Sequence, residues 1–129
     1  MNDYGTIKLL KAVIAADAGQ VIDPDGLRSQ LEGGFIQSAS WTLKEQVKYD
    51  EKGITSKDWE TYPIMTFGEV PEIETILIDR KDSPVLGAGE ATQGPTAAAI
   101  SNAVFDAVGI RLRRIPFTPE MVLEAAAKA

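Results

Sequence analysis

The sequence predicts an α+β domain in which about three helices pack on a mixed β-sheet. Two segments, residues 6–16 and 72–79, are apolar and rich in β-branched residues, as strands are. Helix-start signals stand between and after these segments, and no internal repeat or low-complexity linker divides the chain. Strands and helices in this irregular order favour helices gathered on one face of a sheet. A length of 129 residues suits a single domain with its own core.

The first predicted element is a mostly buried strand over residues 6–16. The segment is apolar apart from Thr6 and two spaced lysines, and it contains several β-branched residues. A short helix is the alternative, because periodicity does not separate strand from helix in a short apolar run. Residues 17–20 are then predicted to form a turn.

A helix of about 18 residues is predicted after this turn, from its capping signals and apolar periodicity. Asp23 can cap the first turn, and Pro24 suits the first helical position. One face of the helix carries an apolar residue at every fourth position: Leu27, Leu31, Phe35, Ala39 and Leu43.

Two consecutive glycines, Gly33 and Gly34, interrupt the predicted helix. Each glycine costs a helix about 1 kcal/mol relative to alanine, so another contact must offset the cost. Close packing against another helix is the preferred interpretation, and close approach of a bound ligand is the alternative. Gln30, one turn earlier, is an unremarkable polar residue by itself.

Shorter extended pieces are predicted between this helix and the strand over residues 72–79. Residues 45–50 alternate as strands do, and residues 50–53 form a turn. Trp59 is expected to anchor a polar loop, and residues 62–67 to be extended, with Pro63 favouring an edge or irregular segment. Their patterning is weaker than that of the strand over residues 72–79.

Two further helices are predicted towards the C-terminus. The first covers residues 95–108, with Pro95 in its first turn and Gly109 at its end. The second follows Thr118 as its cap and runs from Met121 to about Lys128.

Composition narrows the chemistry that the chain can perform. Without histidine or cysteine, it has no Ser-His-Asp or Cys-His machinery, no disulfide and no thiolate ligand for zinc or an iron–sulfur cluster. Any acid–base role falls to Asp, Glu, Lys or Tyr. A net charge of -6 argues against nucleic acids and anionic membranes as partners.

The sequence also bears on localisation. No apolar run approaches the roughly 20 residues that span a bilayer. The first residues lack the basic and apolar blocks of a signal peptide. We therefore expect a cytoplasmic protein, with a periplasmic assembly as the open alternative.

The candidate functional stretch is Gly-Ala-Gly-Glu-Ala-Thr-Gln-Gly-Pro at residues 87–95. It precedes a predicted helix N-terminus, whose unsatisfied amides can hold an anion or oxyanion. The glycines leave room for a ligand beside Glu90. In the alternative, Glu90 is a solvated carboxylate in the first turn of a helix, and spacing alone favours this alternative.

Several motifs in the right order resemble the C-terminal end of the molybdenum-binding subunit of the xanthine dehydrogenase/aldehyde oxidase family. Residues 87–91, 94–95, 99–105 and 109–116 carry the resemblance most strongly. Residues 17–24 and 30–34 agree with earlier family motifs, with alanine at position 18 and aspartate at position 23 in place of cysteine and asparagine. The segment Glu-Ala-Thr at residues 90–92 is most similar to the branch containing isoquinoline 1-oxidoreductase and nicotinate-type dehydrogenases.

The resemblance implies a role for five residues. Glu90 would be the active-site base of a molybdenum hydroxylase, an oxidoreductase that hydroxylates an aldehyde or N-heterocycle with water as the oxygen source. Gln30 would hydrogen-bond the molybdopterin cofactor, and Gly87, Ala88 and Gly89 would form a backbone wall beside the molybdenum. A carboxylate in a partly dry pocket suits such a proton transfer when its pKa matches that of its partner.

Members of the family are several times longer than this chain. The resemblance therefore implies that residues 1–129 are one domain, the C-terminal segment of a molybdopterin-binding domain. Implied partners are the remainder of the molybdopterin-binding subunit and an iron–sulfur subunit, and an uncovered apolar face would favour self-association. We expect no metal ligand in this chain, no bound molybdopterin and no turnover by the chain alone. The alternative is a non-catalytic binding or assembly module that keeps the family fold.

Overall fold

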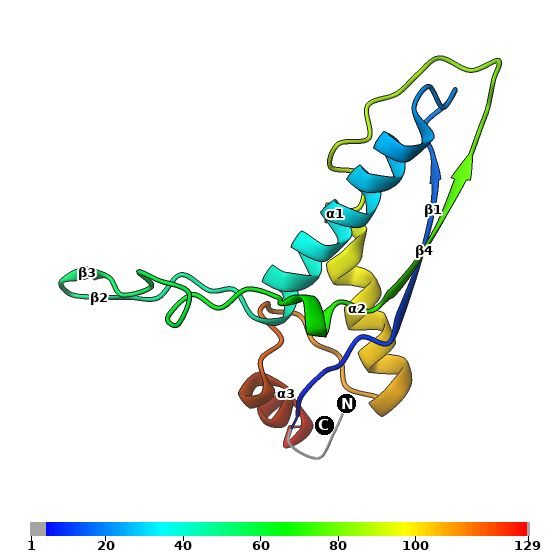
Figure 1. The fold of residues 1–129 in the computed structure, drawn as a ribbon. Coiled ribbons are helices and arrows are strands. Elements are labelled where there is room, and N and C mark those ends of the chain that lie inside the picture. The colour runs from blue at the N-terminus through cyan, green and yellow to red at the C-terminus, as the bar shows by residue number, and fades with distance from the viewer. Residues whose placement is uncertain (1–4, 129) are drawn as a thin grey trace.

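The computed structural model describes residues 5–128, and within them three α-helices accompany short strands (Figure 1). The α+β class with three helices is therefore confirmed. In chain order the elements are β1 (Lys11–Asp17), α1 (Pro24–Leu43), β2 (Tyr49–Asp50), β3 (Gly53–Ile54), the short 3-10 helix η1 (Phe67–Glu69), β4 (Glu72–Ile78), α2 (Gln93–Val108) and α3 (Pro119–Ala126).

The strands form two separate pairs in the described part of the chain. β1 and β4 are parallel, in a register that runs from Lys11 opposite Glu72 to Asp17 opposite Ile78. β2 and β3 form a small antiparallel hairpin through the turn predicted at residues 50–53. Both long strands are confirmed, although the first begins at Lys11 rather than at residue 6. The parallel pair and the antiparallel pair therefore form two separate sheets among the described residues.

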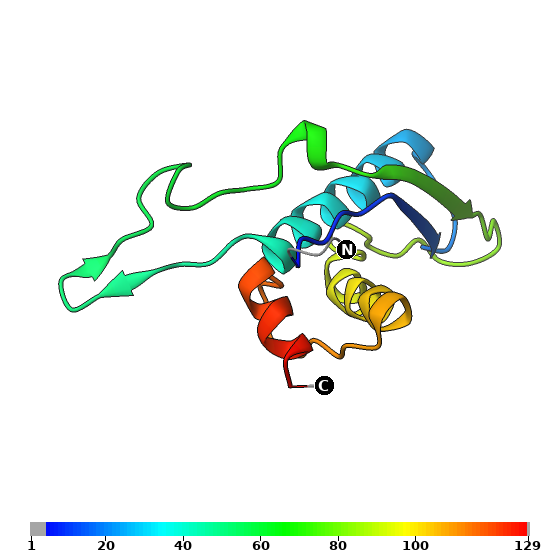
Figure 2. The same cartoon turned by 90° about the horizontal axis from the view of Figure 1, so that it is seen from below.

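Helix α1 forms as its capping and periodicity predict. The Asp23 side chain accepts a hydrogen bond from the Gly26 N–H at 3.0 Å. In the predicted apolar stripe Leu31, Phe35 and Ala39 are buried, and the outer two members are partly buried. Because α1 packs against both α2 and β4, its stripe lies at the centre of the core (Figures 1 and 2).

The other elements complete this core from several sides. Ile14 of β1, Ile100 and Val104 of α2, and Val122 of α3 are all buried with the α1 stripe. The cap of α3 forms as predicted, since the Thr118 side chain accepts a hydrogen bond from the Met121 N–H. Helix α2 ends as predicted at Gly109, which adopts a left-handed conformation at φ 72°.

The two helical glycines have different surroundings. A Cβ atom on Gly34 would stand 2.6 Å from the Thr92 hydroxyl, at the turn that precedes α2. A Cβ atom on Gly33 would meet nothing within 4 Å among the described residues. Close packing is thus confirmed at Gly34, whereas Gly33 faces open space.

Residues 44–66 leave the body of the protein as an arm that carries the β2–β3 hairpin (Figures 1 and 2). The prediction that Trp59 anchors this arm is wrong, because its side chain is 75% exposed. Hydrogen bonds between Asp58 and Thr61 hold the local turn instead. Residues 62–67 form no regular strand, in keeping with the irregular alternative at Pro63.

None of the helices in residues 5–128 combines the length and apolar character needed to cross a lipid bilayer.

We predict that Gly34→Ala lowers the free energy of unfolding by about 1–2 kcal/mol. The added methyl group would displace the Thr92 hydroxyl, and the overpacking outweighs the gain in helix propensity. Gly33→Ala is the matched control and should stabilise the chain by about 0.5–1 kcal/mol, because its methyl group meets open space. Urea unfolding followed by circular dichroism measures both, and equal stabilisation by the two variants would contradict the packing at Gly34.

A second prediction concerns acid stability. Hydrogen bonds from the Lys44 ammonium, at 2.6 Å, and from the Thr66 N–H lower the pKa of Glu69 from 4.5 to about 2. Because the folded pKa is the lower one, this pairing stabilises the protein above pH 4.5, and the contribution is lost as the pH falls towards 2. The pair is partly exposed, so Glu69→Gln should lower stability at pH 7 by no more than about 1 kcal/mol.

The difference between wild type and Glu69→Gln should therefore shrink as the pH falls from 4.5 to 2, as seen in thermal unfolding at several pH values. Lys44→Met should give the same profile, because it removes the same ion pair from the other side. A stability difference that does not change with pH would contradict the assignment.

Candidate functional site

The glycine-rich loop is held first by the turn that follows β1. Because β1 and β4 are parallel, the loops that leave their carboxyl ends start at the same edge of the sheet. The Leu86 N–H donates to the Ala18 carbonyl at 2.9 Å, and the Arg80 N–H donates to the Gly19 carbonyl at 3.1 Å. These bonds place residues 80–86 directly against residues 18–19.

Gly19 allows this contact through its missing side chain. It has a positive φ of 73°, and a Cβ atom there would collide with the Pro84 carbonyl oxygen. The Asp17 carboxylate accepts from the Gly19 N–H at 3.0 Å and from Arg80 Nη1 at 3.1 Å. These two bonds, the Gly19 bond first, lower the pKa of Asp17. The Asp-Ala-Gly segment therefore acts as a structural anchor for the loop.

The loop is held a second time where it enters α2. The Thr92 hydroxyl is buried and donates to the Leu31 carbonyl of α1 at 2.8 Å. The Ser38 hydroxyl donates to the Gln93 carbonyl at 2.8 Å, so α1 also holds the first residue of α2. The sequence patterns assigned no structural role to Thr92 or Ser38. The one sequence signal for this contact was Gly34 in the middle of α1, because a glycine there leaves space for the Thr92 side chain.

Between these two anchors lies the segment that contains the candidate base. Residues 89–92 form a turn in which the Glu90 carbonyl accepts from the Gln93 N–H at 3.2 Å. Glu90, Gly87 and Gly89 are exposed, and Ala88 is partly buried. Cβ atoms on Gly87 and Gly89 would meet nothing within 4 Å, so the backbone of this segment is open to a ligand.

The structure brings some of the predicted site residues together. Gln30, exposed on α1, and Ala88 line the same cavity of about 210 Å³, between the start of α1 and the loop that follows β4. Glu90 is not among the residues lining this cavity. Gln30 is therefore grouped with the alanine of the loop, and Glu90 lies beyond it along the same loop.

These residues fit one wall of a site for an organic cofactor. The Gln30 amide can both donate and accept hydrogen bonds, and the loop backbone beside it is unobstructed. Within residues 5–128, no group of three or more His, Cys, Asp or Glu residues could hold a metal ion. The wall can thus contact a cofactor by hydrogen bonds, but its described side chains provide no set of metal ligands.

A family model described as a molybdopterin cofactor-binding domain matches residues 2–71. The matched range contains Gln30 and both anchoring glycines, Gly19 and Gly34, and it ends before the loop that carries Glu90.

Curated relatives match almost the whole chain. A nicotinate dehydrogenase subunit from Pseudomonas putida is 46% identical over 94% of this chain and 10% of its own length. The beta subunit of isoquinoline 1-oxidoreductase from Brevundimonas diminuta is 30% identical over 90% of this chain and 15% of its own length. The chain therefore spans about a tenth to a sixth of these relatives.

Solved structures contain the same fold. The aldehyde oxidoreductase from Desulfovibrio desulfuricans matches with a TM-score of 0.83 and 31% identity, over 95% of this chain and 14% of that one. The quinoline 2-oxidoreductase from Pseudomonas putida matches with a TM-score of 0.79 and 25% identity, over 94% of this chain and 16% of that one. The arrangement of helices and strands is therefore that of a segment within larger oxidoreductases.

We predict that Gly19→Ala destabilises the chain more than Gly109→Ala does. Both glycines have nearly the same positive φ, 73° and 72°, so both variants bear the strain of about 1–2 kcal/mol for a left-handed residue. Only Gly19→Ala adds a collision with the Pro84 carbonyl, which should cost about 1–3 kcal/mol more. Chemical denaturation measures the difference, and equal losses would show that residues 80–86 are not held against Gly19.

Proposed function

Because the chain belongs to the molybdopterin cofactor-binding domain family, we propose that it forms one wall of the active site of a molybdenum hydroxylase. The observation that carries this proposal is the loop at residues 86–92, which is held at both ends while its middle stays open. A functional loop needs this combination of a fixed backbone and an accessible face.

The proposed substrate is an aldehyde or an N-heterocycle. The names of the relatives support this class, since they include a nicotinate dehydrogenase, an isoquinoline 1-oxidoreductase and an aldehyde oxidoreductase. Because the chain spans about a tenth to a sixth of such proteins, most of a substrate pocket would come from elsewhere. We propose the remainder of a molybdopterin-binding subunit and an iron–sulfur subunit as partners, and we propose that the chain alone is inactive.

Glu90 is the proposed catalytic base. Molybdopterin, when bound, supplies the redox-active metal at which water-derived oxygen is transferred to the substrate. The task of Glu90 is to accept a proton at its carboxylate, and a carboxylate does this best with a pKa matched to the proton donor. The side chain is exposed in this chain, so the remaining subunit would have to cover it and create the partly dry pocket that such a base requires.

The cofactor contacts are proposed for the wall beside Glu90. Gln30 would hydrogen-bond the cofactor through its side-chain amide, and Gly87, Ala88 and Gly89 would contact it through their backbone. Gln30 and Ala88 already share a cavity, and the two glycines place no side chain in front of the backbone. The contacts with α1 and the β1 turn would keep this wall in position without the cofactor.

A non-catalytic assembly module is the second candidate function. It is favoured by one observation, namely that Glu90 is exposed and does not line the cavity that Gln30 and Ala88 share. In this alternative the chain keeps the fold and the anchors but contributes no base.

We predict that Glu90→Gln abolishes turnover of the complex between this chain and the remaining subunits. Losing a general base lowers the rate by about 10²–10⁴-fold. Molybdenum content and the size of the complex should not change, because the Glu90 side chain is exposed and the hydrogen bond to Gln93 uses its backbone carbonyl. Steady-state kinetics, metal analysis and size-exclusion chromatography measure these quantities.

Two controls accompany this experiment. Glu51→Gln changes an exposed glutamate in the turn between β2 and β3, and it should leave turnover unchanged. The isolated chain should contain no molybdenum, and a stoichiometric amount would contradict the proposed shared site. Full turnover of the Glu90→Gln complex would instead support the assembly module.

A further inference from the structure

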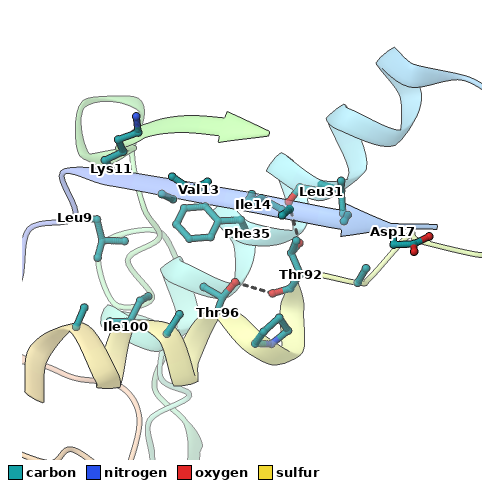
Figure 3. Close-up of a pocket in the computed structure, with 17 residues that line it drawn as sticks. Leu9, Lys11, Val13, Ile14, Asp17, Leu31, Phe35, Thr92, Thr96 and Ile100 are labelled. Atoms are coloured by element: carbon teal, nitrogen blue, oxygen red, sulfur yellow. Dashed lines mark hydrogen bonds between the residues drawn. The ribbon is translucent and has the colours of Figure 1, made fainter. Parts of the chain in front are cut away.

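A second, larger cavity of about 550 Å³ runs along β1 on the side opposite β4. It is lined by every residue of β1, from Lys11 to Asp17, but by no residue of β4 (Figure 3). Successive side chains of a strand point to opposite faces of its sheet. A cavity that touches all seven residues must therefore follow the edge of the strand rather than one of its faces.

The backbone at this edge is free to pair within the described chain. The Glu72 N–H of β4 donates to the Leu10 carbonyl at 3.2 Å, so the backbone groups of Leu10 face β4. Along β1 the backbone groups of successive residues then point alternately towards β4 and away from it. The even-numbered residues direct their backbone groups to β4, and Val13 and Ala15 direct theirs towards the cavity. The two-stranded sheet has no neighbour on that side among residues 5–128.

The opposite edge of the sheet is protected. By the same alternation Thr75 of β4 points its carbonyl outwards, and Arg28 Nη1 of α1 donates to it at 2.8 Å. The Thr75 hydroxyl also donates to the Glu32 carboxylate at 3.0 Å. The edge of β1 has no comparable cover from a hydrogen-bonding side chain in the described residues. Folded proteins protect unpaired edges because such edges recruit other strands.

The cavity suits an uncharged, apolar segment. Leu31 and Phe35 of α1 line it across from β1 (Figure 3). The small residues Pro95, Ala99 and Ala103 of α2 also line it. The charges at its two ends are already paired. Lys11 Nζ lies 2.8 Å from Glu74, and Asp17 lies 3.1 Å from Arg80.

We propose that the free edge of β1 is a docking site for an extended, uncharged strand of the remaining molybdopterin-binding subunit. The strand would pair with Val13 and Ala15 and bury its side chains between β1 and α2. This inference rests on the proposed function, and the length of the relatives identifies the occupant. The nicotinate dehydrogenase subunit has about nine-tenths of its length outside the segment that matches this chain. Pairing along an exposed edge supplies affinity through the main chain and specificity through the groove.

Binding to the Pseudomonas putida nicotinate dehydrogenase subunit tests the proposal, after the segment matching this chain has been deleted from that subunit. The excised segment of that subunit serves as the positive control. Isothermal titration calorimetry measures affinity, and hydrogen exchange measures protection of individual amides. On binding, the amides of Val13 and Ala15 should become protected, whereas those of Ala12 and Ile14 should already be protected in the free chain.

Two matched pairs of variants locate the contact. Ala15→Pro removes the N–H that faces the cavity and leaves the bonds to β4 intact, whereas Ala15→Ser retains that N–H. Ala99→Glu places a carboxylate in the cavity, whereas Ala98→Glu alters an exposed neighbour that does not line it. Ala15→Pro and Ala99→Glu should each weaken binding about tenfold or more, and the two controls by less than about threefold. Ala99→Glu keeps the test valid if Ala15→Pro does not fold.

The outcomes separate this inference from the proposed function. Unchanged binding by Ala99→Glu, or no new protection at Val13 and Ala15, would overturn the docking site and leave the proposed function standing. In another outcome the excised control segment binds the truncated subunit while this chain does not. That result would contradict the proposed function, because this chain would not take the place of the segment, and the docking site would fail with it. A homodimer of this chain that already protects the two amides would also overturn the proposal, since a second copy would then be the occupant.

Discussion

The rest of the structure depends on the close contact between α1 and the turn that begins α2. At Gly34 the helix has no side chain, and the Thr92 hydroxyl occupies the vacant space and donates to the Leu31 carbonyl. The contact is buried, so the hydroxyl and the carbonyl need one another as partners. It fixes where α2 starts, and Ser38 strengthens it through the Gln93 carbonyl. The position of the Glu90 turn follows directly from this contact.

The parallel pairing of β1 and β4 supplies the other half of the arrangement. It places the Asp17–Gly19 turn and the loop after β4 at the same edge, where their backbones bond to each other. The loop between β4 and α2 is thus fixed at two distant points and exposed between them. A two-stranded sheet achieves this positioning but leaves one edge of β1 open. The same pairing therefore accounts for both the anchored loop and the open edge of β1.

Several large apolar side chains of the arm and its base are exposed. The arm at residues 44–66 carries Tyr49, Ile54 and Trp59 into solvent, and Phe67 at its base is completely exposed. These features accord with a chain that spans about a tenth to a sixth of the oxidoreductases it matches. The core is confined to the region where the α1 stripe meets β1, β4, α2 and α3.

The sequence by itself determined the local elements of this protein. The signals that predicted the helices correctly each act within a few residues. They are the Asp23 and Thr118 caps, the apolar residue at every fourth position of α1, and Gly109 at the end of α2. Trp59 was assigned wrongly because an aromatic residue in a polar loop does not reveal whether a core lies within its reach. Other features are visible only in the tertiary structure. The Thr92 hydroxyl packs against Gly34, and Gln30 and Ala88 line one cavity. The edge of β1 stays open. Each of these depends on residues far apart in the chain, and no local spacing encodes that proximity.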